Sequence, residues 1–189
     1  MASDTRDRLI RTTGRLLRTQ GYAGTGLNQI MAEADAPKGS MYFHFPGGKA
    51  EMAAAAVHRF AERITAHLVK RLAGSPTVRD AVAGFFDSYV EHLAATQFAE
   101  GCAVATVALD GAAEHDVLAE AAGSALHEWT DLIARALEAE GRAADEAHRL
   151  ATLVVATIEG TIVMARGERS TEPIEAARDA LVPLLDSPG

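Results

Sequence analysis

Side chains able to hold phosphate are concentrated between residues 25 and 49. Duplex DNA presents dense rows of phosphate charge along its backbones. Hydroxyl and imidazole groups donate hydrogen bonds to phosphate oxygen, and an ammonium group adds positive charge. The residues of this kind in the segment are Thr25, Tyr42, His44 and Lys49. We therefore predict that these four side chains contact the DNA backbone.

A second set of residues in the same segment suits the edges of DNA bases. Lys38 can donate to guanine, and Ser40 can either donate or accept a hydrogen bond. Gly39, between them, allows the backbone to approach a base edge closely. These three residues are predicted to read the major groove. The alternative is a plain helical hairpin whose polar face is merely solvated, with Tyr42 half-buried in the core and His44 at the surface.

Two short helical patterns and a tight break would position these side chains. Thr25 is a good N-cap for a helix that carries Leu27, Ile30, Met31 and Ala34. Asp35 tolerates a left-handed turn, and Pro37 suits the first turn of a next helix that runs from Lys38 to about His44. Two such helices joined by a short turn form the unit that places a helix in the major groove.

The distribution of charge agrees with a DNA-binding head. The net charge of the chain is -8, which is unusual for a DNA-binding protein. Residues 1–75 hold 11 Lys and Arg against 6 Asp and Glu (11 − 6 = +5), whereas residues 76–189 hold 7 against 20 (7 − 20 = −13). A basic head on an acidic body predicts that nucleic-acid contact is confined to the head.

The rest of the chain has helical periodicity. The period predicts about nine helices and no sheet, so the fold class is all-α. Residues 101–109 form an apolar run that fits either a buried strand or a short buried helix, and we favour a helix because an isolated strand would leave its hydrogen-bonding groups unpaired. We expect a helix-turn-helix DNA-binding domain over 1–48 and a ligand-binding and dimerisation domain over 49–189, in which 49–73 form the connecting helix.

The sequence contains few signs of other chemistry. The His residues show no metal-binding spacing, and no Ser/His/Asp order or phosphate-cradling glycine motif is present, so we expect neither a metal, a cofactor nor an enzyme. The single Cys102 fits a reducing cytoplasm. No continuous apolar run reaches the length of a membrane helix, and no signal peptide is predicted. A cytoplasmic protein without a membrane partner is expected.

Residues 25–52 resemble the signature of the TetR family of transcriptional regulators. The matching positions are Thr25, Ile30, Ala34, Gly39, Tyr42, His44, Phe45 and Lys49. Asp35 and Ala36 stand where Gly and Val are usual, and Pro37 replaces a frequent Ser. The segments Pro37–Ser40 and Phe45–Lys49, together with the run Gly101–Leu109, resemble the LmrA/YxaF-like subgroup.

The resemblance implies an all-helical homodimer that usually represses a neighbouring operon and releases DNA when a small molecule binds. For this subgroup it implies multidrug or antibiotic efflux, or a response to flavonoids. It assigns the phosphate contacts to Thr25, Tyr42, His44 and Lys49. Base contacts would be made by Lys38, Gly39, Ser40 and Phe43. The partners expected are palindromic double-stranded operator DNA, a small hydrophobic effector and a second copy of the chain.

Two further sites are predicted in the body. A pocket for the effector should be mostly apolar with a few polar groups, although ordinary core packing explains the same residues. The candidates are Phe86, Tyr89, Cys102, Thr106, Trp129 and Ile133. The segment Leu150–Met164 has more apolar surface than one core face needs, which indicates a subunit interface. The predicted interface residues are Leu150, Val154, Thr157, Ile158, Thr161, Ile162 and Leu181.

Two residues of the body have ambiguous roles. Glu159 needs a partner in so apolar a segment, either across the dimer or on a ligand. Cys102 suits an inert core position better than a redox sensor. Apart from the regulator, the sequence leaves open a helical adaptor that binds another protein through the surplus apolar face, and a small helical enzyme.

Overall fold

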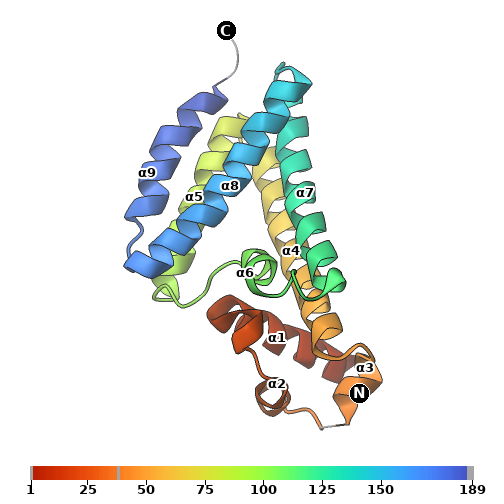
Figure 1. Cartoon of the computed structure of the whole chain (residues 1–189). Helices are drawn as coiled ribbons and strands as arrows, with labels where there is room; N and C mark the ends of the chain where they lie inside the picture. The colour runs from red at the N-terminus through yellow and green to blue at the C-terminus, as the bar shows by residue number, and fades with distance from the viewer. Residues whose placement is uncertain (1, 38, 187–189) are drawn as a thin grey trace. The chain divides into compact units, whose positions relative to one another are not determined.

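The computed structural model describes residues 2–37 and 39–186, and all the regular elements in these ranges are helical. They are α1 (Ala2–Gly24), α2 (Leu27–Glu33), α3 (Ser40–His44), α4 (Gly48–Gly74), α5 (Val78–Ala95), α6 (Ala103–Asp110), α7 (Asp116–Ala139), α8 (Ala144–Glu168), α9 (Glu172–Leu181) and the 3-10 turn η1 (Val182–Leu185). The all-α prediction is confirmed, as is the helical reading of residues 101–109 (Figure 1).

Local sequence signals explain where several helices begin and end. Thr77 caps α5, because its hydroxyl accepts a hydrogen bond from the backbone N–H of Asp80 at 3.1 Å. Gly141, with φ at +96°, follows the end of α7. A proline lies in the first turn of α9, as expected from Pro173. Helix α3 begins at Ser40, and its predicted start, Lys38, lies outside the described residues.

The chain divides into two compact units, each made of two segments. The first unit contains residues 1–63 and 102–125, and the second contains residues 64–101 and 126–189. This grouping differs from the predicted boundary at residue 48. Helix α6 and the beginning of α7 belong with the helix-turn-helix segment, because α6 packs against α1. Helices α4 and α7 each contribute to both units.

The first unit is built around α1. Leu9, Leu16 and Leu17 are almost fully buried, and they recur at helical spacing on the face that packs inward. Helices α2, α3 and α6 all pack against α1. Thr106 of α6 donates a hydrogen bond to the backbone oxygen of Leu17 at 3.2 Å. The short helices α2 and α3 are therefore held on a long one.

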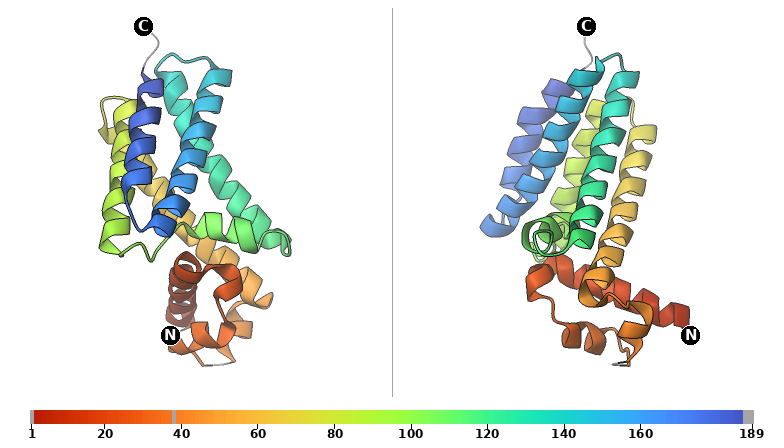
Figure 2. Two further views of the ribbon diagram at one scale, coloured as in Figure 1. Left: turned by 60° about the vertical axis from the view of Figure 1, so that its left-hand side comes forward. Right: turned by 45° about the vertical axis from the view of Figure 1, so that its right-hand side comes forward.

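The second unit is a helical bundle. Helices α5, α8 and α9 pack against one another, and the later parts of α4 and α7 complete the bundle (Figure 2). Phe86 and Leu93 of α5 are buried in it, as are Leu137 of α7 and Ile174 of α9. The loop between α5 and α6 is fixed by Arg166, which donates to the backbone oxygens of Phe98 (3.4 Å) and Ala99 (3.2 Å).

The end of α1 depends on a glycine. Gly21 has φ +75° and ψ 177°, a conformation that is essentially restricted to glycine. A Cβ atom at this position would lie 2.6 Å from Oδ2 of Asp110. The same carboxylate oxygen accepts a hydrogen bond from the backbone N–H of Ala23 at 3.1 Å. Asp110 thus occupies the space that the missing side chain leaves.

We predict that Gly21→Ala destabilises the protein by about 1–3 kcal/mol, because alanine is strained in this conformation and would displace Asp110. Urea unfolding followed by circular dichroism would measure the loss. Gly123→Ala, in α7, is the matched control, since a Cβ atom there has no neighbouring atom within 4 Å. The control should be neutral or stabilising by roughly 1 kcal/mol. Equal stability of both variants would contradict the prediction.

Candidate nucleic-acid interface and effector cavity

Helices α2 and α3 form the predicted two-helix unit. Asp35 lies in the turn between them with φ at +48°, the left-handed conformation expected there. Met41 and Phe45 are buried and attach α3 to the first unit. Because a helix of five residues is unstable alone, these two side chains decide whether it forms.

The outward face of α3 carries large side chains. Tyr42 is 63% exposed and Phe43 is 76% exposed, which is unusual for aromatic residues in a helix this short. The ring of His44 meets that of Phe43 edge-on, with centroids 5.0 Å apart. The structure thus brings together three of the predicted DNA contacts on one exposed helix.

The other predicted base contacts lie at the start of α3. Gly39 is exposed, and a Cβ atom added to it would meet nothing within 4 Å, so its backbone is open to a ligand. Ser40 donates its hydroxyl hydrogen to the backbone oxygen of Pro37 at 2.7 Å. Because Ser40 is half-buried, the lone pairs of its hydroxyl oxygen are only partly accessible to a ligand. Lys38 lies outside the described residues.

Thr25 and Lys49 have intramolecular partners. Thr25 is 1% exposed, and its hydroxyl donates to the backbone oxygen of Gly21 at 2.6 Å. The Lys49 ammonium donates to the backbone oxygen of Tyr22 at 2.6 Å and lies 4.0 Å from the centroid of the Tyr22 ring. Partial burial lowers the pKa of Lys49, and the nearby Asp110 opposes this shift. Both residues fix the end of α1 in this structure, and their contacts to phosphate stay predictions.

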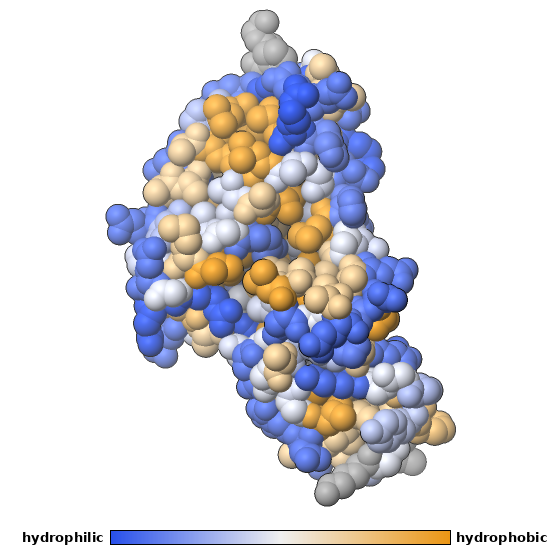
Figure 3. Space-filling model, in the orientation of Figure 1, coloured by the Kyte–Doolittle hydropathy of each residue, from blue (hydrophilic) through white to orange (hydrophobic). Residues whose placement is uncertain are grey.

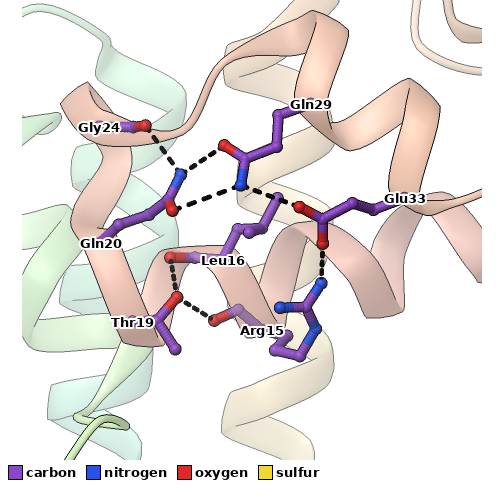
Figure 4. A network of polar contacts seen from close by, with 7 residues as sticks. All are labelled: Arg15, Leu16, Thr19, Gln20, Gly24, Gln29 and Glu33. Atoms are coloured by element: carbon purple, nitrogen blue, oxygen red, sulfur yellow. Dashed lines mark hydrogen bonds and ion pairs between the residues drawn. The ribbon is translucent and has the colours of Figure 1, made fainter.

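A polar network attaches α2 to α1 (Figure 4). The amide of Gln20 donates to Gln29 at 2.8 Å, and the amide of Gln29 donates to Glu33 at 2.9 Å. Glu33 also pairs with Arg15. The hydrogen bonds from Gln29 and Arg15 lower the pKa of the Glu33 carboxyl. The network sets the angle of α2, and its members were not identified as functional from the sequence.

Arg8 supports the turn itself. Its Nε donates to the backbone oxygen of Ala34 at 2.9 Å, and a terminal nitrogen donates to the oxygen of Asp35 at 3.2 Å. These bonds satisfy carbonyl groups at the end of α2 that the helix leaves unpaired. Arg8 is one of several basic residues spaced along α1. The helical spacing of these residues does not predict that Arg8 binds a turn 26 residues later in the sequence.

The second unit contains an apolar cavity between α4, α5, α7 and α8. The space between its lining side chains amounts to about 20 Å³, room for about one water molecule. Tyr89, Trp129 and Ile133, three of the residues predicted to form an effector pocket, line this cavity. Val154, Ile158 and Glu159 of α8 also line it. Glu159 is the single carboxylate among the described lining residues, so the cavity has one acidic group in otherwise apolar walls.

Trp129 is oriented by a hydrogen bond inside this unit. It is 4% exposed, and its indole Nε1–H donates to the hydroxyl of Thr65 at 3.1 Å. A buried indole N–H was expected to need a partner, and Thr65 of α4 supplies one. The ring of Phe85 lies 5.4 Å from that of Tyr89, centroid to centroid, on the α5 side of the cavity.

Three predicted pocket residues do not line the cavity. Cys102 is the N-cap of α6, and Thr106 lies within α6, so both belong to the first unit. Phe86 is buried in α5 beside Phe85, but it packs into the core of the bundle. Helical periodicity identified these residues as inward-facing and could not tell which interior they face.

Helix α8 has two apolar faces. Most of the predicted interface residues are buried within the chain. Those on the inner face of α8 are Val154, Ile158, Thr161 and Ile162, and Leu181 of α9 is buried as well. Leu150 and Thr157 of α8 are half-buried. The outer face exposes Leu153, Ala156, Gly160 and Val163, with Met164 beside it. Apolar surface gathers over α8 and α9 in Figure 3.

Helix α8 is long and apolar enough to cross a membrane by length and composition alone, and 39% of its most apolar 18-residue window is buried in the structure. One face in the bundle core and one apolar face outside account for that composition in a globular protein. Leu153 and Val163 point outward where Val154 and Ile162 point inward, so the predicted interface residues Val154 and Ile162 are covered within the chain.

Comparison with known proteins agrees with this architecture. Residues 9–56 match the family described as bacterial regulatory proteins, tetR family, and residues 78–180 match the C-terminal domain described as transcriptional regulator LmrA/YxaF-like. The HTH-type transcriptional regulator LmrA of Bacillus subtilis is 32% identical over 171 residues, which cover 90% of this chain and 91% of LmrA.

Solved structures show the same fold. A regulatory protein TetR from Rhodobacter sphaeroides aligns with a TM-score of 0.84 and 26% identity, covering 94% of this chain and 96% of that one. A cysteine-substituted variant of the TetR family regulator CifR, solved with 26-bp double-stranded operator DNA, aligns with a TM-score of 0.80 and 22% identity over 96% of both chains. The helix-turn-helix unit, the helical body and the two matching domains agree, and the chain belongs to the TetR family of transcriptional regulators, with a C-terminal domain of the LmrA/YxaF-like type.

Proposed function

We propose that the protein is a ligand-responsive repressor. A homodimer would bind a palindromic operator through α3 of each subunit and release it when a small hydrophobic molecule enters the cavity of the second unit. The resemblance to LmrA/YxaF-like regulators implies that the controlled genes serve efflux or a response to drugs or flavonoids. The protein would act in the cytoplasm, where the chromosome is accessible.

Helix α3 carries this proposal. It exposes Tyr42 and Phe43 to solvent although both are large aromatic residues. Exposed apolar surface of this kind is typical of a binding site. Gly39 at its start leaves the backbone open. We assign phosphate contacts to Tyr42 and His44, and base contacts to Phe43 and the backbone near Gly39. CifR, which has the same fold, was solved with operator DNA.

Lys49 and Thr25 take part in a different way. Lys49 would reach a phosphate by leaving the Tyr22 oxygen, and its partial burial there lowers its pKa. Thr25 would have to release the Gly21 oxygen before its hydroxyl could donate to a phosphate, because a phosphate oxygen only accepts hydrogen bonds. These two contacts would form only as the operator docks.

The cavity supports the effector part of the proposal. Its walls are apolar, its single described carboxylate is Glu159, and a hydrophobic molecule would have to widen the gaps between side chains to enter. Ile64 and Leu68 of α4 line the cavity, and α4 begins at Gly48, directly after the α3 segment. A shift of α4 caused by an effector would thus move the reading helix. Two such helices must match half-sites spaced by about a helical turn of DNA.

A second copy of the chain would cover the outer face of α8. Leu153, Ala156, Gly160 and Val163 follow helical spacing, and the small residues among them allow two helices to approach closely. Ala180 and Leu184 extend the apolar surface into the α9–η1 region. A symmetric pair of α8 and α9 helices would bury both.

Tyr42→Ala should weaken operator binding about tenfold or more, because one phosphate contact and its packing are lost. Fluorescence anisotropy with duplex DNA from the region upstream of the gene, at several salt concentrations, would measure it. Leu109→Ala is the matched control, since Leu109 is a large apolar residue of α6 that is 78% exposed. The proposal fails if no salt-dependent complex forms, or if Tyr42→Ala binds as the unmodified protein does.

Val155→Phe should fill the cavity and reduce effector binding about tenfold or more, since Val155 lines it from α8. Trp129, the single tryptophan of the chain, lies in the same wall and should report binding of flavonoids and apolar drugs by its fluorescence. Val69→Phe in α4, at an exposed position outside the cavity, is the control. Equal effector response of DNA binding in both variants would exclude this cavity as the effector site.

Val163→Arg should convert the proposed dimer into a monomer, because two arginines would meet across a symmetric interface. Sedimentation velocity would give the oligomeric state. Val117→Arg in α7, another exposed valine, should leave the dimer unchanged. A dimer that survives Val163→Arg would place the interface on another face.

A further inference from the structure

A basic groove lies between α1 and α4 in the first unit, apart from the exposed face of α3. The two helices come close at Gly14 and Ala56, where a Cβ atom on Gly14 would lie 3.8 Å from that of Ala56. The side chains around this point leave a groove of about 170 Å³. We call this feature the arginine groove, because its walls are formed by Arg11, Arg15, Arg18, Arg59 and Arg63.

The spacing of the arginines places their charges around one space. Arg11, Arg15 and Arg18 recur at steps of four and three residues, so they share one face of α1 and span about 10 Å along it. Arg59 and Arg63 are one turn apart on α4. No carboxylate lines the groove in the described part of the chain.

Two carboxylates outside the groove neutralise part of this charge. Asp7 lies 3.6 Å from Arg11 and 3.3 Å from Arg59, and Glu33 pairs with Arg15. The five guanidinium groups concentrate positive charge around one space. All these side chains are at least partly exposed, so a soluble anion has access to them.

The inner end of the groove is organised by Phe60. The guanidinium carbon of Arg18 lies 5.8 Å from the centroid of this buried ring, and that of Arg63 lies 5.7 Å from it. Two groups of the same charge therefore converge on one aromatic ring from two different helices. An anion bound between the two guanidinium groups would offset the repulsion between them.

The groove is distant from the DNA-reading residues along α4. Arg59 and Arg63 follow Lys49 by ten and fourteen residues, which corresponds to about 15 and 21 Å of helix. A duplex is too wide to enter a space between two packed helices. The ligand must be compact and carry several negative charges.

We propose that the arginine groove binds a compact polyphosphate, either a nucleoside triphosphate or inorganic polyphosphate. Guanidinium groups form paired hydrogen bonds with phosphate oxygens, and a short chain of phosphates matches a row of arginines better than a single anion does. This site is separate from both the operator surface and the effector cavity, and it does not depend on the repressor function.

Isothermal titration calorimetry of the full chain in 150 mM KCl tests the site, with sodium tripolyphosphate and ATP as probes. Saturable binding at one site per chain is expected. The Arg18→Gln/Arg63→Gln variant should bind about tenfold more weakly or worse. The control, Lys70→Gln/Arg135→Gln, removes the same charge from exposed positions elsewhere and should change the affinity less than about twofold. Circular dichroism melting confirms that both variants fold.

The two probes distinguish the source of the phosphates. Equal affinity for tripolyphosphate and ATP would mean that the phosphate chain alone is recognised, whereas tighter ATP binding would add a contact to the nucleoside. The absence of saturable binding at about 1 mM probe overturns the proposal. So does an equal loss in both double variants, which would indicate general attraction to a basic surface. Tighter binding of single-stranded oligothymidylate through Arg18 and Arg63 would replace the small anion with a nucleic acid.

Discussion

A helix of five residues cannot maintain itself in water, and the first unit is organised around that limit. Helix α3 gains its structure from Met41 and Phe45, which are buried in the unit while their neighbours Tyr42 and Phe43 remain outside. Arg8 holds the turn before it, and the network from Gln20 to Glu33 sets the helix that precedes it. Stability is thus supplied from α1, so the exposed face of α3 is free to match a partner.

Several polar residues of this unit are already used inside the protein. Lys49 and Thr25 close the end of α1 through the oxygens of Tyr22 and Gly21, and Asp110 of α6 fills the space beside Gly21. A basic side chain near a reading helix is readily interpreted as a DNA contact, yet here it has a structural partner as well. Any contact with phosphate at Lys49 exchanges one hydrogen bond for another, so its net contribution is smaller than its charge suggests.

The sequence was sufficient to predict the helices and the family, because helical spacing and the segment around Tyr42, His44 and Phe45 are local properties. It was insufficient where one pattern fits two environments. Thr106 faces α1 through its hydrogen bond to Leu17, and Cys102 also belongs to the first unit and not to the bundle. On α8 the pattern is apolar on both faces: Val154 and Ile162, which were predicted at an interface, are buried within the chain, whereas Leu153 and Val163 are exposed. Burial separates these cases, whereas periodicity does not.

The two apolar faces of α8 also affect the stability of a subunit that has not yet formed a dimer. A newly made subunit that has closed its bundle still exposes Leu153, Val163 and Met164 in a row. If a second copy covers that row, association and folding share one equilibrium, and the melting temperature rises with protein concentration. At a low cellular concentration, a larger fraction of the protein would then be monomeric, with its apolar surface exposed and accessible to proteases and chaperones. The amount of functional regulator would then fall more steeply than the total amount of the chain, because each subunit needs a second copy to be stable.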